Sequence, residues 1–287
     1  MLQPQPHIKF DRFFKIPLVL LVSLFFQHRS IAQDYPLKID QYPFIDYEKN
    51  QLEYYGDAYQ QFAPIFQRLN KMILKGEGKC HIVHIGDSHL QADYYSGEMR
   101  KRLQTFAQGS KGARGFLFPY RAAKTNNPVN YRVSYTGNWE GCRNVERKKK
   151  CDLGLSGINV STYDSIATMK FTFNDEDYPD YDFNRVKVFY NTHFCPYTIE
   201  VGNAGVNFNV KTHYELGYTE FHFDGYMDSL NLKFIKLDTF PEPFTLHGIS
   251  FENDDPGIVY STVGVNGAEV PSYLRCQLFK NHLTALA

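Results

Sequence analysis

The stretch HIVHIGDSHLQAD, residues 81–93, joins a short apolar run to groups that could do chemistry. Ser88 stands directly beyond the apolar run and before a polar helix start. Open α/β sheets bind ligands beyond the carboxyl ends of their strands, and backbone N–H groups at a helix start can stabilise an oxyanion there. Ser88 is therefore a candidate nucleophile; a helix-capping serine is the alternative that residue type alone favours.

A second stretch, GVNGAE at residues 264–269, follows another apolar run and precedes a segment with helical spacing. IGDSHLQAD and GVNGAE resemble, in this order, the first and second signature blocks of the SGNH or GDSL esterase and lipase superfamily. His89 stands where many members have leucine. The resemblance spans roughly Phe44 to the C-terminus. The chain is similar to a secreted subgroup of the superfamily in which a β-sandwich module interrupts the hydrolase domain.

This resemblance implies the chemistry of a serine esterase. Ser88 would attack an ester carbonyl, and the backbone N–H groups of Ser88 and Gly267 would bind the developing oxyanion. Asp87, His89 and Asn266 are candidates for lining the site. Asp87 is expected to be a turn and helix-start carboxylate rather than the triad acid. No cofactor is expected.

Two parts of the superfamily's machinery have no match in this sequence. The third block, G-x-N-D, supplies an oxyanion-hole asparagine, but the Asn253–Asp254 pair precedes the second block and lacks the glycine. No Asp-x-x-His occurs to supply the triad histidine and acid. We therefore expect either a truncated reading of a longer hydrolase or a degenerate member. If the chain did turn over esters, the base would have to be sought among His84, His89, His247 and His282.

Charge and histidine spacing argue against other classes of site. The 31 basic and 31 acidic residues balance, which removes the electrostatic argument for binding nucleic acid. His81 and His84 lie at positions that a strand sends to opposite faces, so no shared metal ion is expected. The run ERKKK, residues 146–150, is expected to be a solvated loop.

The N-terminus has the layout of a secretory signal peptide over residues 1–32. Basic residues precede the apolar run IPLVLLVSLFF, residues 16–26, and small residues follow it, with cleavage expected after Ala32. Eleven residues rising about 1.5 Å each fall short of a hydrocarbon core roughly 30 Å thick. No stable membrane span is therefore expected, and the protein is expected to be secreted or periplasmic.

The five cysteines fit an exported protein without forming a disulfide framework. Cys142 and Cys151 flank the basic run at a separation that a loop could close, so they are the expected pair, although sequence alone does not fix the connectivity.

Hydrophobic spacing predicts an α/β fold interrupted by β structure. Helical stripes fall in residues 53–79 and 91–106, and buried strands at 80–85 and 257–263. Between them, short alternating runs separated by turn residues predict an antiparallel sandwich over residues 120–256. Its aromatic residues, Trp139 among them, are expected in the core rather than in a sugar-stacking platform.

Two domains are therefore expected. Residues 33–119 and 257–287 would form the first and second parts of a three-layer SGNH-like hydrolase with a parallel sheet. Residues 120–256 would form the inserted module. Two parallel strands are marginal alone. A final helix would leave its apolar face partly uncovered, which predicts self-association; this face comprises Leu274, Leu278, Phe279, Leu283 and Leu286.

Two functions compete at this stage. The first is an exported serine ester hydrolase that removes acyl or acetyl groups from a polysaccharide or another small ester. The second is a non-catalytic carbohydrate-binding protein that works through the β module. The missing histidine favours the second, whereas Ser88 and Gly267 favour the first.

Overall fold

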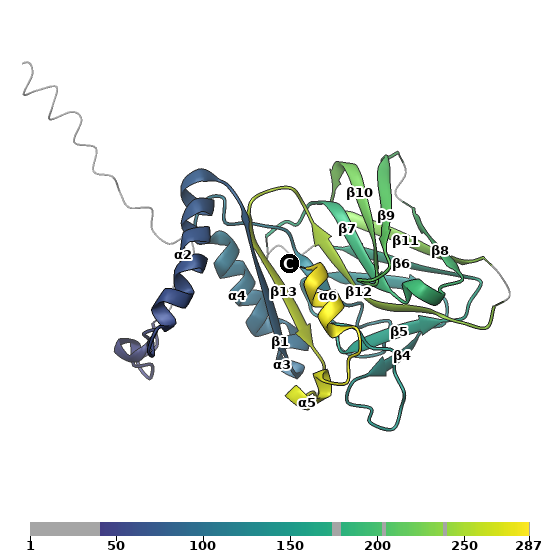
Figure 1. Ribbon diagram of the computed structural model, residues 1–287, viewed down its shortest axis with the longest axis horizontal. Helices are drawn as coiled ribbons and strands as arrows, with labels where there is room; N and C mark the ends of the chain where they lie inside the picture. The colour runs from purple at the N-terminus through teal and green to yellow at the C-terminus, as the bar shows by residue number, and fades with distance from the viewer. Residues whose placement is uncertain (1–40, 174–178, 203–204, 238–239, 287) are drawn as a thin grey trace, which may run out of the picture. The chain divides into compact units, whose positions relative to one another are not determined.

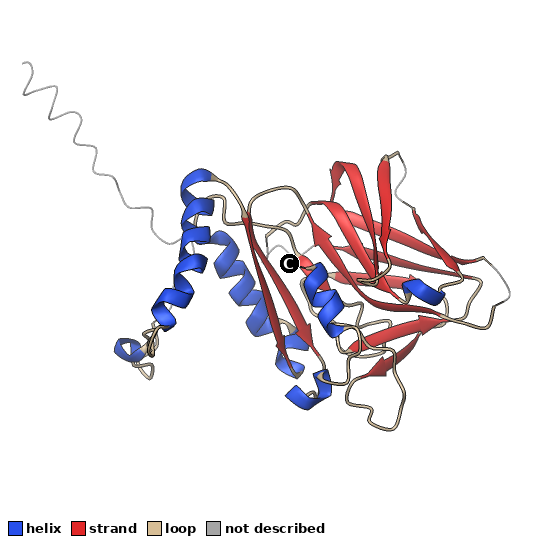
Figure 2. Ribbon diagram, in the orientation of Figure 1, coloured by secondary structure: helices blue, strands red, loops and turns tan. Residues whose placement is uncertain are grey.

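Helices flank the parallel strands near the two ends of the described chain, and antiparallel strands fill the middle (Figure 1, Figure 2). The computed structural model describes residues 41–173, 179–202, 205–237 and 240–286, all within one unit, Ile39–Ala287. The expected signal peptide, residues 1–32, lies outside the described residues. The described part is a mixed α/β fold.

The two strands expected from the apolar runs pair with each other in parallel. β1 (Lys79–Gly86) lies beside β13 (Gly257–Gly264), with Lys79 opposite Gly257 and Gly86 opposite Gly264. Every residue of β13 is buried, whereas those of β1 are half-buried or exposed. The expected three-layer parallel sheet is not seen: in the described residues its parallel part is this pair.

Three helices contact the parallel pair: α2 (Ala58–Lys75) on β1, the short α3 (Ser88–Ala92) on both strands, and α4 (Tyr94–Thr105) on β13. The helical stripes predicted both α2 and α4. However, Met72 is the only buried residue of α2, and its apolar Phe62 and Ile65 are exposed.

The alternating runs form two antiparallel sheets. The seven-stranded sheet runs in the order β4 (Glu140–Arg143), β5 (Ile158–Thr162), β12 (Phe244–Glu252), β7 (Phe183–Tyr190), β10 (Tyr218–Met227) and β9 (Phe208–His213), and β2 (Gly115–Leu117) pairs with β12. The four-stranded sheet runs in the order β3 (Arg132–Thr136), β6 (Ile166–Thr172), β11 (Ser229–Lys236) and β8 (Tyr197–Val201). Apolar side chains of both sheets share one buried cluster, as period-two patterning requires.

Trp139 belongs to this shared core. Its side chain is 3% exposed, and its ring lies edge-on to Phe234 of β11 and Phe244 of β12 at centroid distances of 5.6 and 6.4 Å. The expectation of a core aromatic is confirmed for Trp139, which cannot stack on a sugar from this position.

The sheets and the parallel pair are connected by β2, which lies outside the expected module. Phe116 of β2 pairs with Ser250 of β12, and its backbone N–H donates to Ser261 Oγ of β13 at 2.9 Å. A separate module at residues 120–256 therefore stays a prediction.

The end of the chain corrects one expectation. Two short helices, α5 (Val270–Tyr273) and α6 (Phe279–Ala285), replace the single final helix. Leu274 is exposed, but the apolar side of α6 packs into a cluster with β2, β7, β10 and β13. The uncovered face on which self-association was predicted is therefore largely covered, because the seven-stranded sheet reaches it; the α6 residues in that cluster are Phe279, Leu283 and Ala285, with Leu286 just beyond.

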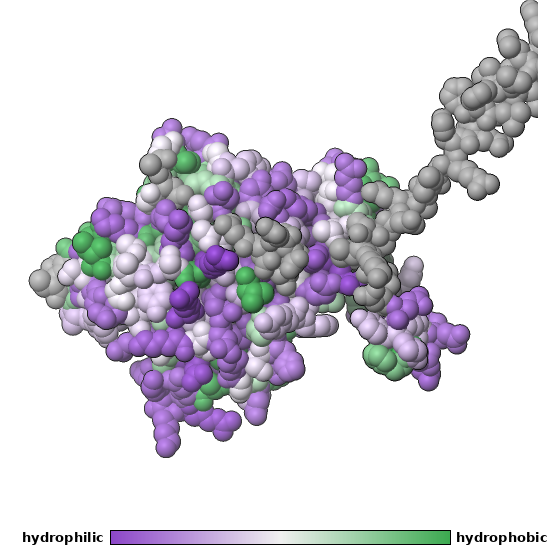
Figure 3. Space-filling view, turned by 180° about the vertical axis from the view of Figure 1, so that it is seen from behind, coloured by the Kyte–Doolittle hydropathy of each residue, from purple (hydrophilic) through white to green (hydrophobic). Residues whose placement is uncertain are grey.

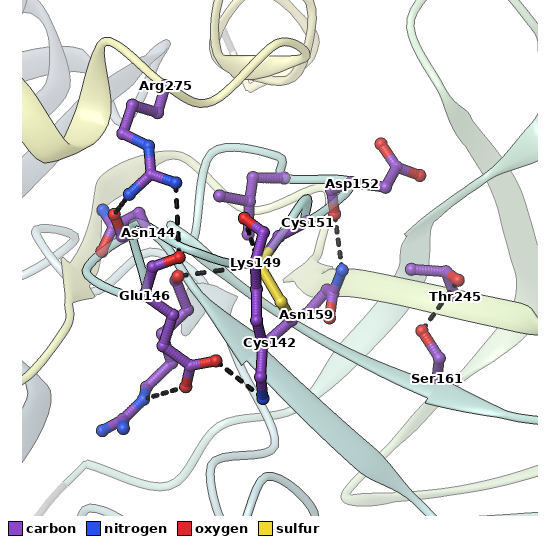
Figure 4. The surroundings of a disulfide bond; sticks show 12 residues. Cys142, Asn144, Glu146, Lys149, Cys151, Asp152, Asn159, Ser161, Thr245 and Arg275 are labelled. Atoms are coloured by element: carbon purple, nitrogen blue, oxygen red, sulfur yellow. Dashed lines mark hydrogen bonds and ion pairs between the residues drawn. A yellow bond between two sulfur atoms is a disulfide. The ribbon is translucent and has the colours of Figure 1, made fainter.

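The expected disulfide is confirmed between Cys142 and Cys151 (Figure 4). Arg275, between α5 and α6, fixes the same loop to the C-terminal segment, since its guanidinium donates to Asn144 O at 2.6 Å and to Glu146 O at 3.4 Å. The Glu146 carboxylate also pairs with Lys149 at 2.9 Å. The basic run is thus a loop held by local ion pairs.

Seen from the side opposite to Figure 1, the described surface is mostly hydrophilic with separate apolar spots (Figure 3). A search of the described residues finds no helix with the length and hydrophobicity that a membrane crossing needs.

Candidate active site

Ser88 is the first residue of α3, two positions beyond the end of β1. Asp87 is its N-cap, and the Asp87 carboxylate accepts the backbone N–H of His89 at 3.0 Å. Capping is therefore done by Asp87, and Ser88 is left exposed. Its Oγ makes no hydrogen bond within the described part of the chain. A solvent-facing hydroxyl at a strand-to-helix turn is a position from which a nucleophile can act.

The second block lies at the same edge of the parallel pair. Gly86 and Gly264 are partners in the register, so the residues that follow each of them leave the pair side by side. Gly264 must be glycine here, because a Cβ would lie 2.6 Å from Asp87 O and 2.2 Å from Gln91 N. Gly267 has φ +79° and open space around it, which favours glycine for conformational reasons.

Gln91 connects the two blocks, a role that the sequence did not reveal. Its side chain is fully buried. The Gln91 Oε1 accepts the backbone N–H of Asn266 at 2.8 Å, and its Nε2 donates to Thr125 Oγ1 and Asn126 O, both at 3.0 Å. One side chain thus holds the helix of Ser88, the loop of Gly267 and the segment after β2 together.

Two tyrosines fix the strand ends from opposite sides. Tyr120 donates to Gly264 O and Tyr273 donates to Gly86 O, each at 2.7 Å. Burial raises the pKa of both phenols well above the ordinary value, so both hydroxyls remain donors at neutral pH. Because these contacts join residues more than 140 positions apart, no local pattern could have predicted them.

A pocket of about 540 Å³ lies beside the turn that carries Ser88, although neither Ser88 nor Gly267 is one of its lining residues. The two neighbours of Ser88 in the sequence, Asp87 and His89, line this pocket. It is also lined by His84 of β1, by Tyr95 of α4, and by Glu269 and Tyr273 around α5. Of the expected site residues, Asp87 and His89 therefore face this pocket. Asn266 is placed by its backbone contact with Gln91, and its side chain is not part of the lining.

The histidines divide between different places. His84 lines the pocket, whereas His81 lines a separate hollow between α2 and β1. His247 and His282 are fully buried beside each other, with His247 Nε2 3.3 Å from Asp152 Oδ2. Asp152, His247 and His282 provide an acid and two imidazoles, but none of them contacts Ser88 in the described part of the chain.

Asn253 and Asp254 lie at the other end of the parallel pair. Lys79, the first residue of β1, donates to Asn253 O, and the Asp254 carboxylate accepts from Asn184 at 2.7 Å and from Arg185 at 3.0 Å. A strand of eight residues, rising about 3.3 Å each, separates this end from Ser88. Asn253 is therefore not the third oxyanion donor.

A buried charge cluster supports the helix that carries the site. Asp93 follows α3 and pairs with Arg100 at 2.9 Å and with Arg114 at 3.2 Å, all three being fully buried or nearly so. Arg100 also donates to Tyr260 O of β13 at 2.9 Å. The cluster fixes α3 and α4 against β13. Among the described residues, no group of three potential metal ligands is present.

Comparison with known proteins gives one informative likeness. Neither a protein-family model nor a curated protein matches the chain. A solved structure described as "Peptidoglycan O-acetylesterase in action, 5 min" is similar at a TM-score of 0.50 and 24% identity, over 74% of this chain and 54% of that one. The chain thus spans about half of that protein's length.

A second structure, a Streptococcus pneumoniae beta-galactosidase, covers 39% of this chain and 84% of its own at 13% identity and a TM-score of 0.27, which supports no argument. The first likeness concerns the fold, and it shows that the matched part of the chain shares the fold of that structure.

Proposed function

We propose that the chain is an exported serine esterase, with Ser88 as its nucleophile, that removes acetyl groups from a polysaccharide. The observation that supports this most is the register of β1 and β13, which brings the Ser88 turn and the Gly264–Gly267 turn to one edge beside a pocket. The acetylesterase fold likeness supports an acetyl ester of a glycan as the substrate class.

In the proposed reaction, Ser88 Oγ attacks the acetyl carbonyl carbon. The negative charge moves to the carbonyl oxygen, which in this proposal accepts the N–H groups of Ser88 and Gly267. The bond between the acetyl carbon and the sugar oxygen then breaks, and the sugar alcohol leaves with the proton that Ser88 Oγ loses. Water cleaves the acetyl–Ser88 ester, which releases acetate and a proton and restores the Ser88 hydroxyl. Gln91, Tyr120 and Tyr273 are positioning residues, since their polar groups bind the backbone of the two turns.

The attacking hydroxyl also needs a base. No histidine contacts Ser88 Oγ in the described residues, and an unactivated serine is a weak nucleophile at neutral pH. Loss of a single oxyanion donor costs roughly 100- to 1,000-fold in rate. The 287-residue chain should therefore hydrolyse p-nitrophenyl acetate barely above background.

The test extends the chain by a segment that carries the family's G-x-N-D and D-x-x-H blocks. The extended protein should release acetate from an O-acetylated polysaccharide, and Ser88→Ala should abolish the gain. Ser134→Ala, which changes an exposed serine of β3, serves as the matched control. If Ser88→Ala left the activity intact, Ser88 would not be the nucleophile.

The exposed, unpaired Ser88 keeps a second candidate open, a non-catalytic glycan-binding protein. In that case the chain would bind the polysaccharide but release no acetate in either form, which the same assay detects.

A further inference from the structure

The pocket beside Ser88 is larger than the ester group that would react there. Its volume of about 540 Å³ lies within the roughly 300–1,000 Å³ that is typical of sites for whole small molecules. An acetyl group would fill only a small part of this space, which leaves room for the alcohol part of an ester substrate.

Tyr95 offers a flat apolar surface on the pocket wall. It is the second residue of α4 and its side chain is 60% exposed, and its ring is T-shaped to that of His84 at a centroid distance of 6.0 Å. A side chain with this exposure leaves much of its ring surface available. The apolar face of a pyranose ring stacks on such a surface, whereas a core aromatic would be covered.

His84 adds a polar group next to this ring. The His84 Nδ1 and the Tyr260 hydroxyl form a hydrogen bond at 2.6 Å, which leaves Nε2 as the ring nitrogen without a partner among the described residues. Either nitrogen of an imidazole can donate or accept, according to the tautomer. A flat apolar ring beside a free imidazole nitrogen matches the two surfaces of a sugar, a C–H face and a rim of hydroxyl groups.

We infer that Tyr95 and His84 form a sugar subsite, in which the pyranose ring that carries the ester stacks on Tyr95 while a ring hydroxyl forms a hydrogen bond with His84 Nε2. The inference rests on the proposed function for the identity of the site. It adds which residues recognise the alcohol part of the substrate.

Binding to a protein that cannot turn over tests the subsite. The probe is an O-acetylated N-acetylglucosamine tetramer, titrated calorimetrically into the Ser88→Ala chain. Adding Tyr95→Ala should weaken binding about tenfold, whereas Tyr95→Phe should stay within about threefold. The matched control is Tyr94→Ala, because Tyr94 is 67% exposed on the same helix and does not line the pocket.

The outcomes separate the subsite from the catalytic proposal. Binding that depends on Tyr95 supports the subsite even if the extended enzyme releases no acetate, in which case only the esterase proposal fails. The subsite is wrong if the Ser88→Ala chain does not bind the tetramer at millimolar concentration. It is also wrong if Tyr95→Ala and Tyr94→Ala bind it equally well.

Discussion

Asp93 is the residue on which the described site depends most for stability. Burial alone would raise the pKa of its carboxyl, but the charges of Arg100 and Arg114 outweigh this and hold it below the ordinary 3.8. Because the folded-state pKa is the lower one, the contribution of Asp93 is present at neutral pH and is lost as the pH falls through that pKa.

Replacing Asp93 by asparagine should destabilise the protein by about 3–5 kcal/mol, since two buried guanidinium groups lose their counter-ion. Urea unfolding at pH 7 measures this. The control is Glu98→Gln, which breaks the partly exposed Glu98–Arg102 pair and should cost less than about 1 kcal/mol. Equal effects of the two substitutions would contradict the role given to the buried cluster.

Gln91 is the residue that should transmit a local change to the oxyanion loop. Gln91→Ala removes the acceptor of the Asn266 N–H and should cost about 1–3 kcal/mol. Hydrogen exchange of the Asn266 and Gly267 amides should become faster.

Gln104→Ala is the matched control for Gln91, because Gln104 is equally buried but donates to Ile258 O near the start of β13. It should destabilise the protein without accelerating exchange in the 264–267 loop. If both variants accelerated that exchange equally, the effect would reflect global opening rather than the Gln91 contact.

At the scale of elements, the sequence predicted the features that depend on residues close together in the chain. The strands around 80–85 and 257–263 were predictable because both are short apolar runs, although only the second is buried as expected, and α4 was predictable because most of its apolar stripe meets β13. The Cys142–Cys151 pair was predictable because a short loop brings the two residues together.

The rest depends on contacts between distant segments. The cover of α6 comes from strands of the seven-stranded sheet, and β2 joins that sheet across more than 130 residues, so the sequence alone predicted an uncovered helix. Likewise, Ser88 and Gly267 were found from motifs, and His84 was named only as a candidate base. Tyr95 was not predicted as a site residue, because only the fold places it at the pocket.

The disulfide should stabilise the loop between β4 and β5. Closing a loop of this length reduces the entropy of the unfolded chain by an amount worth about 2–3 kcal/mol. The double variant Cys142→Ser, Cys151→Ser should therefore melt at a lower temperature than the parent. A reductant should lower the melting temperature of the parent but not that of the double variant. Cys195→Ser, which removes a free thiol, is the control and should keep the sensitivity to reductant.

At the scale of the whole molecule, three sets of buried polar side chains stabilise three different contacts between elements. The Asp93 cluster joins α4 to β13, Gln91 joins the two site loops, and the His247–His282 pair lies where α6 meets the seven-stranded sheet. The stability of each contact has its own dependence on pH or on sequence change. They can therefore be perturbed one at a time.

The contact between α6 and the seven-stranded sheet should make the fold sensitive to mild acid. Burial, with the neighbouring His247, lowers the pKa of His282 from 6.5 to about 2. His282 Nδ1 accepts the backbone N–H of Leu155 at 3.3 Å, and its Nε2 is buried without a partner among the described residues, so this imidazole must remain neutral in the folded state. In the unfolded chain it binds a proton below about pH 6.5.

Stability is therefore expected to fall as the pH decreases below 6.5, by up to about 1.4 kcal/mol per pH unit from this residue, well above the range in which Asp93 titrates. Urea unfolding at pH 7, 6 and 5 measures the slope. His282→Gln removes the titrating group and should flatten the slope even if it lowers stability at pH 7. His193→Gln, which changes an exposed histidine, should leave the slope as it is. If His282→Gln did not reduce the slope, another group would be responsible for the acid sensitivity. The reason is that only the loss of a titrating group changes the number of protons taken up on unfolding.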